Sequence, residues 1–199
     1  MISDSNSKLG KVPNWSTSPV VTCPGATELC KSTCYVGGRK GYLKVYPSAR
    51  VAYAANTVAV NLSTDWSVGV MRYLSKHRPA MFRIHVSGDF HRAVYVKTWA
   101  RIATMFPGTR FLAFTRSWRV ARLRPSLETL RALPNVQLIA SLDTEAHDAP
   151  NAWRKAWMGS PVSGHSATLC PGYGPAELQC DACGLCFRPV PINVYFPIH

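Results

Sequence analysis

Acidic residues are scarce in this chain of 199 residues, where ten Asp and Glu stand against 23 Lys and Arg and leave a formal net charge of +13. A field of this sign favours polyanions such as nucleic acid or a nucleotide-like substrate. Arginine is abundant, and six Trp and eight Tyr are mixed among the charges, as in surfaces that contact phosphates and stack on bases. We therefore expect a nucleic-acid or nucleotide-like partner, against the simpler interpretation of a basic surface that only confers solubility.

Long apolar segments are absent as well. No run of about 18 consecutive apolar residues occurs, so the sequence predicts no membrane span. The polar first residues lack the apolar core of a signal peptide, and we expect a cytoplasmic protein. The length fits one domain, and a hydrophobic content of 47% is sufficient for an ordinary core.

Common catalytic patterns are also missing. The chain has no Gly-rich phosphate loop, no Gly-x-Ser-x-Gly elbow and no convincing Ser–His–Asp set. It contains neither an internal repeat nor a low-complexity tract. Any chemistry must therefore come from other residues.

Cysteine, in contrast, is plentiful, and its seven residues fall into two groups. A reducing cytoplasm and the odd number favour metal or iron–sulfur binding over disulfides. Three thiolates in one short loop suit a [4Fe–4S] cluster with one open iron, whereas zinc would require a fourth ligand such as His85 or His91. The members of this first group are Cys23, Cys30 and Cys34.

The second group has four members, and its Cys-x-x-Cys-x-x-Cys spacing with an upstream partner is a strong metal signal. It suits a second [4Fe–4S] cluster or tetrahedral zinc, with a redox dithiol as the lesser alternative. Full ligation would leave no open iron, so we expect this site to hold structure or pass electrons. One cluster sharing ligands from both groups is a further arrangement. The members are Cys170, Cys180, Cys183 and Cys186.

Hydrophobic patterning predicts alternating strands and helices, and hence right-handed β-α units around a parallel sheet. The run 19–22 is expected to enter the cysteine loop like a strand, and residues 144–169 are expected to be irregular. Strands are predicted at 81–86, 110–114, 136–140 and 193–196. Helices are predicted from a Ser48 cap, from an Asp65 cap, over 93–105, and over 118–132 with a break or kink at Pro125.

Polar residues follow three successive predicted strands. Ligands of parallel α/β sheets bind beyond the carboxyl ends of the strands. Each tip alone could be an ordinary turn or helix cap, but three together favour a site. The tips are Ser87-Gly88-Asp89, Thr115-Arg116-Ser117 and Ser141-Leu142-Asp143.

Several of these motifs together resemble the bacteriophage gene product 88 family over most of the chain. They are the Ser-Asn-Ser-Lys-Leu-Gly start, the Cys-Pro-Gly and Cys-x-x-x-Cys-Tyr elements, the Ser-Gly-Asp and Thr-Arg-Ser tips, and the cysteine-rich tail. More remotely, the sequence is similar to radical S-adenosylmethionine (SAM) enzymes. That resemblance implies a partial parallel β/α barrel whose three-cysteine loop binds a [4Fe–4S] cluster, with SAM on the open iron.

In that resemblance, Cys30 and Cys34 match the first two cysteines of the loop, and Tyr35 falls where an aromatic residue lies near adenine. Gly37 occupies the position of the third cysteine, which Cys23 replaces from upstream. Asp89 falls where an acidic motif grips the SAM amino group. The implied pocket is lined by Ser87, Gly88, Asp89, Thr115 and Ser141, and Arg116 and Asp143 orient a charged ligand.

We therefore expect an α/β fold with a core over residues 1–145 and a cysteine-rich lobe over residues 146–199. The leading function is an iron–sulfur protein of radical SAM-like type that acts on nucleic acid or a nucleotide in the bacterial host cytoplasm. One alternative is a metal-braced phage protein that binds nucleic acid or a transcription complex. A second is a cluster-containing nuclease with Asp89 and Asp143 as magnesium ligands.

Overall fold

The computed structural model describes residues 1–38 and 41–198. In this part of the chain, eight strands form one sheet in the order β1-β2-β3-β4-β5-β6-β8-β7. Only the β1–β2 pair is antiparallel among the neighbouring strands. The expected α/β fold with a mainly parallel sheet is thus confirmed. The strands are β1 (Ile2–Ser3), β2 (Asn14–Trp15), β3 (Met81–Ile84), β4 (Arg110–Thr115), β5 (Val136–Leu142), β6 (Lys155–Met158), β7 (Thr168–Leu169) and β8 (Val194–Phe196).

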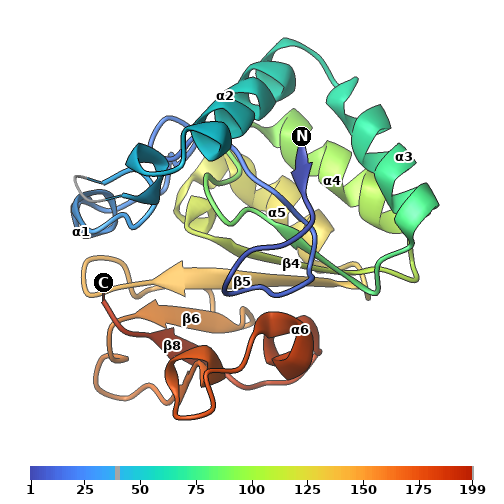
Figure 1. Cartoon of the computed structure of the whole chain (residues 1–199). Helices are drawn as coiled ribbons and strands as arrows, with labels where there is room; N and C mark the ends of the chain where they lie inside the picture. Colours follow the sequence, from blue (N-terminus) through green and yellow to red (C-terminus); the bar gives the residue numbers. More distant parts are fainter. Residues whose placement is uncertain (39–40, 199) are drawn as a thin grey trace.

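The strand order explains the position of the helices. Parallel strands that are neighbours both in sequence and in space need crossovers of one hand, which puts the connecting helices on one face. Figure 1 shows α2 to α5 on one side of the sheet and α6 with the C-terminal segment on the other. The helices are α1 (Glu28–Ser32), α2 (Pro47–Leu62), α3 (Trp66–His77), α4 (Ala93–Met105), α5 (Arg124–Arg131) and α6 (Cys180–Cys183).

The face covered by helices carries the main core. Alternate strand residues point to opposite faces, and Phe82, Ile84 and Phe111 point to the helices. All six tryptophans are buried in the same core. They hold the fold together and offer no exposed platform for bases, so the surface stacking expected from the composition is wrong for tryptophan.

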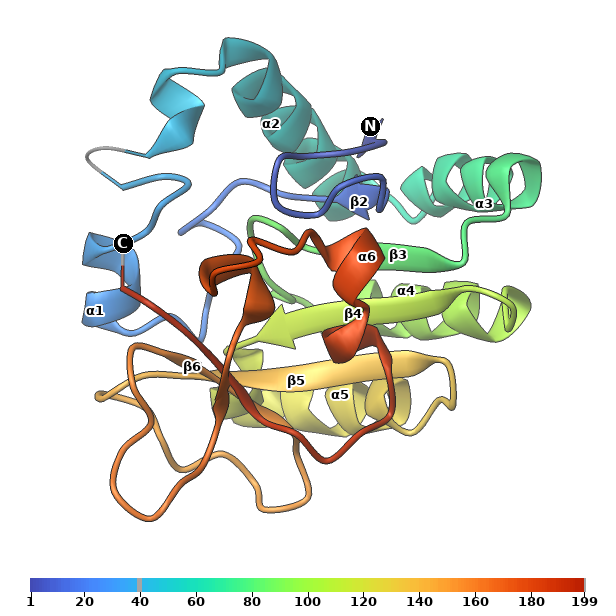
Figure 2. The same cartoon turned by 60° about the horizontal axis from the view of Figure 1, so that its bottom comes forward.

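The opposite face is covered by segments from both ends of the chain. Leu9 and Val12 from the N-terminal arm (residues 1–13) and Phe187 from the C-terminal segment pack on Leu112 and Ile139. In Figure 2, α6 lies over this face of the sheet. Residues 146–199 also supply β6, β7 and β8 to the sheet, so the cysteine-rich segment and the core share one framework.

Several local expectations were wrong. Strand β6 lies inside the stretch expected to be irregular; its four residues are too short for a visible period and include no β-branched residue. Residues 19–22, which were expected to enter the cysteine loop like a strand, form a turn in which Val20 has a φ of 68°. The strand that precedes the cysteine loop is β2.

The helix starts also differ from expectation. Pro125 occupies the first turn of α5, where its missing N–H costs nothing, so it starts the helix and does not kink it. Ser48 lies inside α2, whose cap position is Tyr46. Asp65 is the cap residue of α3 but makes no capping hydrogen bond through its side chain. Within the described residues, no helix is long and apolar enough to cross a bilayer.

Candidate functional site

The loop that carries the first cysteine group lies across the carboxyl ends of the parallel strands. The Tyr35 hydroxyl donates to the carbonyl of Val86 just beyond β3 at 3.0 Å, and the Thr33 hydroxyl lies 3.7 Å from the sulfur of Met158 in β6. Figure 2 shows the arrowhead of β4 pointing to the side of the molecule where α1 lies. This is the edge where parallel sheets place their ligands.

Helix α1, which contains Cys30, is fixed by one threonine. The Thr27 hydroxyl accepts from the backbone N–H of Cys30 at 3.0 Å and donates to Oδ2 of Asp143 at 2.6 Å. The backbone N–H of Leu29 donates to Glu145 at 3.2 Å. The loop after β5 therefore sets the position of Cys30.

A buried ion pair lies beneath this helix. Nη1 of Arg116 is 2.7 Å from Oδ2 of Asp143 without the alignment of a hydrogen bond, and Nη2 donates to the carbonyl of Leu142 at 3.3 Å. The two side chains are only 6% and 0% exposed. The pair thus joins the ends of β4 and β5 from within the protein.

Asp89 joins the ends of β3 and β4 in a similar way. Oδ1 accepts from the Thr115 hydroxyl at 2.6 Å and from the N–H of Phe90 at 2.7 Å, and Oδ2 accepts from the N–H of Arg116 at 2.8 Å. Burial raises the pKa of Asp89 to about 6, although these hydrogen bonds favour the carboxylate. Both oxygens are thus engaged by protein donors.

Two further tip residues have packing roles. Gly88 has a φ of +80°, and a Cβ at this position would lie 2.0 Å from Oγ1 of Thr17. The Ser87 hydroxyl donates to the carbonyl of Thr17 at 2.9 Å. These two residues therefore seat the start of the cysteine loop on β3. The last predicted pocket residue, Ser141, accepts from the Trp118 indole through its carbonyl at 3.2 Å.

The three thiols of the first group lie within electrostatic range of one another. Burial, together with the negative charges of Asp89, Cys30 and Cys34, raises the pKa of Cys23 to about 12. Burial also raises the pKa of Cys30, opposed by the Arg116 guanidinium. Sγ of Cys34 accepts from the N–H of Gly37 at 3.4 Å. The loop thus gathers three thiols, and burial disfavours the thiolate form of two of them, Cys23 and Cys30.

The second cysteine group lies on the other face of the sheet. Cys180 and Cys183 belong to α6, Cys186 lies in the short 3-10 turn Leu185–Phe187, and Cys170 directly precedes another at Pro171–Tyr173. All seven cysteines are free thiols of intermediate exposure. Among the described residues, no three Cys, His, Asp or Glu side chains are close enough to hold one metal ion.

The two histidines considered as reserve zinc ligands are engaged elsewhere. Nε2 of His85 is 2.7 Å from the Tyr95 hydroxyl, and Nε2 of His91 is 3.0 Å from Oδ1 of Asn61. Burial lowers the pKa of His85 to about 3, so this ring is neutral. Neither contact directs Nε2 at the first cysteine group.

Comparison with known proteins identifies the family. A family model described as "Gene product 88" matches residues 2–168. The chain belongs to the gene product 88 family. It is 35% identical over 103 residues to the Gene 88 protein of Mycobacterium phage D29 and 29% identical over 134 residues to that of Mycobacterium phage L5.

These alignments cover 48% and 64% of this chain and 42% and 54% of the two phage proteins, so the chain spans about half the length of its curated relatives. No solved structure matches. The region matched by the gene product 88 family model contains the first cysteine group and all three strand tips. It ends before Cys170, so the second group lies outside it.

Sequence reasoning missed two residues of the gene product 88 site. Thr27, at the start of α1, carries a detectable signal, because a threonine followed by an acidic residue is a common helix start. Arg119 donates to the carbonyl of Gly25 at 2.8 Å and ties the cysteine loop to the segment after β4. That contact has no signal in the sequence, since it joins residues 94 positions apart.

Proposed function

We propose that this gene product 88 protein is an iron–sulfur protein of radical SAM-like type, with Cys23, Cys30 and Cys34 as the protein ligands of a [4Fe–4S] cluster. The observation that supports it most is the placement of three free thiols on one loop at the carboxyl edge of a parallel sheet. From β1 to β6 the strands follow one another in chain order, as in a partial barrel, and β8 then lies between β6 and β7. The cluster location implied by the resemblance is the same edge.

The residues present fit such a group. Iron–sulfur clusters are held by thiolates, and their own atoms separate the ligating sulfurs, so the thiols need not approach as closely as around a single ion. The burial that raises the pKa of Cys23 is offset when the thiolate binds a metal. The N–H of Gly37 that contacts the Cys34 sulfur is the kind of hydrogen bond that tunes a cluster.

When bound, the cluster would supply an electron to SAM at its open iron. The chain's own residues would position the cluster, because Thr27 and Asp143 orient its ligand Cys30. Tyr35 is 48% exposed beside the end of β3, and its ring is the group offered to adenine. Asp89 already accepts three hydrogen bonds, so in this proposal it shapes the pocket and does not bind the amino group.

Anaerobic reconstitution with iron and sulfide tests the cluster. We expect the wild type and a C183A/C186A control to turn brown and to bind iron and acid-labile sulfide at the first site. A C30A/C34A variant should lack the iron and sulfide that this site binds. The wild type is then incubated with SAM and a reductant, and 5′-deoxyadenosine is measured. Equal iron in wild type and C30A/C34A would refute the cluster site, whereas a cluster without deoxyadenosine would refute only the SAM chemistry.

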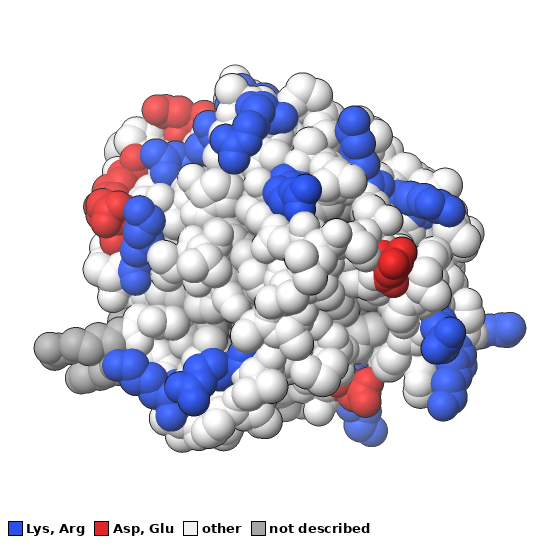
Figure 3. Space-filling view, turned by 90° about the horizontal axis from the view of Figure 1, so that it is seen from above, with Lys and Arg blue, Asp and Glu red and all other residues white. Residues whose placement is uncertain are grey.

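We also propose that the substrate is nucleic acid or nucleotide-like, which the net charge of +13 supports. Figure 3 shows Lys and Arg on the helix-bearing face in several separate groups. Binding of labelled single- and double-stranded DNA and RNA at several salt concentrations provides the test. Electrostatic contact requires affinity to fall steeply with salt, and salt-independent or absent binding would remove this part of the proposal.

The two alternatives have less support. As a nuclease, the protein would need Asp89 and Asp143 as magnesium ligands, but both carboxylates are engaged by protein donors or by Arg116. As a braced binding protein, it would rely on aromatic stacking, yet the tryptophans are buried. The proposed place of action is the bacterial host cytoplasm, whose reducing conditions keep thiols free for metal binding.

A further inference from the structure

The face of the sheet opposite helices α2 to α5 is concave. Phe114 lies in β4 and Phe196 in β8, with β5 and β6 between these strands, so a flat sheet would hold the two side chains about 14 Å apart. Their ring centres are only 5.5 Å apart. The sheet therefore curls toward this face. Both residues are near the carboxyl ends of their strands, where parallel sheets bind ligands.

Three aromatic rings on this concave face carry two cations. The ring centre of Tyr173 is 6.3 Å from that of Phe196, and the Lys8 ammonium lies 3.4 Å from the centre of the Tyr173 ring. The Arg83 guanidinium lies 4.3 Å from the centre of the Phe114 ring. Lys8 and Arg83 are both half-buried, and no ion pair among the described residues includes either of them. Two cations without a carboxylate partner favour the binding of an anion here.

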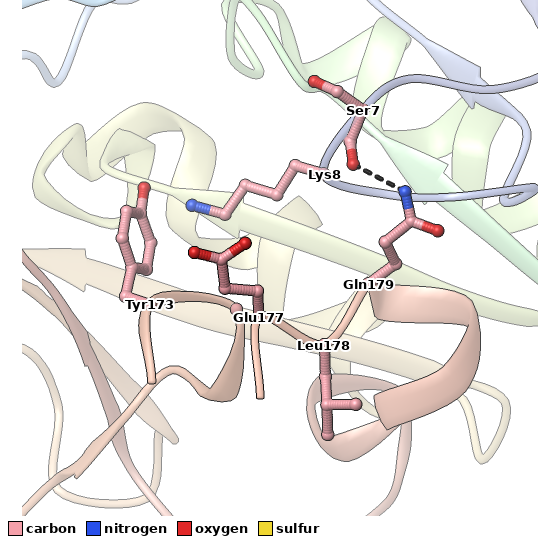
Figure 4. A pocket seen from close by; sticks show the side chains of 7 residues that line it. Ser7, Lys8, Tyr173, Glu177, Leu178 and Gln179 are labelled. Atoms are coloured by element: carbon pink, nitrogen blue, oxygen red, sulfur yellow. Dashed lines mark hydrogen bonds between the residues drawn. The ribbon is translucent and has the colours of Figure 1, made fainter. Parts of the chain in front are cut away.

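The N-terminal arm is held on α6 by contacts that do not use the Lys8 side chain. The N–H of Cys180 donates to the carbonyl of Lys8 at 3.1 Å, and the side-chain amide of Gln179 donates to the carbonyl of Ser7 at 2.8 Å (Figure 4). The Lys8 ammonium thus remains available to a ligand. Arg83 is held through one nitrogen, because its Nε donates to the carbonyl of His85 at 2.9 Å and no described residue accepts from its two terminal nitrogens.

A hollow of about 290 Å³ opens beside the Lys8 ammonium, and Figure 4 shows Lys8 reaching toward Tyr173 and Glu177 in it. This volume is at the lower end of the range of small-molecule sites, about 300–1,000 Å³, and suits one nucleotide unit but not a duplex. The Glu177 carboxylate disfavours a ligand that is only anionic, but it can accept from the amino group of a base such as cytosine. The lining therefore suits a ligand with both an anionic group and an amino donor.

The concave face adjoins the loop of the first cysteine group. The carbonyl of His85, which accepts from Arg83, immediately precedes the carbonyl of Val86, which accepts from the Tyr35 hydroxyl. Tyr35 follows Cys34 in that loop. A ligand held by Arg83 would therefore lie next to the loop that carries the proposed cluster.

We propose that this concave face binds one nucleotide unit, either in a single-stranded nucleic acid or as a free nucleotide. Lys8 and Arg83 hold the phosphate, and the Glu177 carboxylate accepts from the amino group of the base. The ring of Tyr173 forms the apolar wall between them. This inference rests on the proposed function, because it gives the nucleic-acid or nucleotide ligand of that function its binding site.

Fluorescence anisotropy of labelled (dC)6 and (dT)6 oligonucleotides at several salt concentrations tests the proposal. Lys8→Met and Arg83→Met should each weaken the binding of (dC)6 at least about fivefold and reduce the slope of log K against log salt by about 0.7. The matched control K97M/R101M removes one exposed lysine and one exposed arginine from α4, on the other face of the sheet, and should change the affinity by less than about twofold. Competition by unlabelled dCMP shows whether a free nucleotide is sufficient or a strand is required.

Glu177→Gln tests the contact with the base. The wild type should bind (dC)6 at least about threefold more tightly than (dT)6, because thymine has no amino group, and the variant should lose this preference. Equal affinity of the wild type for the two oligonucleotides would refute the role of Glu177.

Thermal unfolding establishes that each variant is folded. If Arg83→Met does not fold, Lys8→Met alone decides the test, because the backbone contacts of Lys8 with α6 remain. Wild-type affinity in Lys8→Met and in Arg83→Met would place the nucleic acid elsewhere and refute this site, while the proposed function would stand. No binding of either oligonucleotide or of dCMP to the wild type would refute the nucleic-acid part of the proposed function together with the site.

Discussion

The two cysteine groups differ most in the charges around them. At the first, burial raises the pKa of Cys23 to about 12, and Asp89 acts in the same direction. At the second, burial raises the pKa of Cys186 to about 11, and Arg154 and Arg83 oppose it. Protein cations act on both groups, Arg116 on Cys30 at the first and Arg154 and Arg83 on Cys186 at the second. Buried carboxylates act against the thiolates only at the first group, where Asp89 raises the pKa of Cys23 and of Cys30.

The largest expected effect tests the buried charge beneath the first site. Arg116→Met leaves Asp143 buried without its cationic partner, and we expect a loss of about 3–5 kcal/mol in the free energy of unfolding. Urea unfolding followed by tryptophan fluorescence measures it. The double variant R116M/D143N should recover part of the loss because no buried charge remains. A loss below about 1 kcal/mol in R116M would show that the pair is not important for stability.

The pH dependence of stability tests Asp89. Its folded pKa is raised from 3.8 to about 6, so between these values the folded state holds a proton that the unfolded chain has lost, and stability falls as pH rises. The folded pKa of His85 is lowered from 6.5 to about 3, so its contribution rises with pH in the same window. The two slopes, each about 1.4 kcal/mol per pH unit, oppose each other in the wild type.

Asp89→Asn removes one of these slopes. The free energy of unfolding of this variant should rise by up to about 3 kcal/mol more than that of the wild type between about pH 4 and 6. Urea titrations at several pH values compare the two proteins. Parallel pH profiles would mean that the carboxyl of Asp89 titrates normally in the folded state.

Arg154→Met tests the turn that carries Cys186. The Arg154 guanidinium donates to the carbonyls of Leu185, Cys186, Arg188 and Ile192, and loss of these four charge-assisted hydrogen bonds should lower the free energy of unfolding by about 2 kcal/mol. Urea unfolding followed by tryptophan fluorescence measures the difference from the wild type. An unchanged free energy of unfolding would show that the turn forms without the guanidinium.

The smallest effect concerns the cap of α1. Thr27→Val removes the hydroxyl that caps the N–H of Cys30 and contacts Asp143, which should cost about 1 kcal/mol. Thr27→Ser keeps the hydroxyl and serves as the matched control. Thermal unfolding compares the three proteins, and iron content reports on Cys30. Equal behaviour of the two variants would assign no role to the hydroxyl.

Much of the sheet could be predicted because β3, β4 and β5 are mainly apolar segments separated by helical patterns. Their carboxyl ends must then meet, which predicted the proximity of Asp89, Thr115 and Asp143. Strand β6 could not be predicted, because four residues without β-branching gain their pairing only from β5 and β8.

Side-chain roles at the sites were less accessible to sequence reasoning. Composition counts tryptophans but does not place them, and all six are in the core. Both carboxylate oxygens of Asp89 accept hydrogen bonds from protein donors, and these contacts depend on how β3 and β4 are aligned. The part played by Arg154 depends on a turn more than 30 residues away in the sequence. Each of these facts is tertiary, and no local pattern encodes it.

The contact between the N-terminal arm and α6 joins residues as far apart as Ser7 and Gln179, 172 positions along the chain. During synthesis at about 5–20 residues per second, the arm must therefore wait roughly ten seconds or more for its partner to leave the ribosome. Until then one side of the nascent sheet stays bare, with its apolar residues open to chaperones or to other chains. The N-terminal arm can therefore cover this face of the sheet only late in synthesis. That step comes when the segment with the last four cysteines leaves the ribosome.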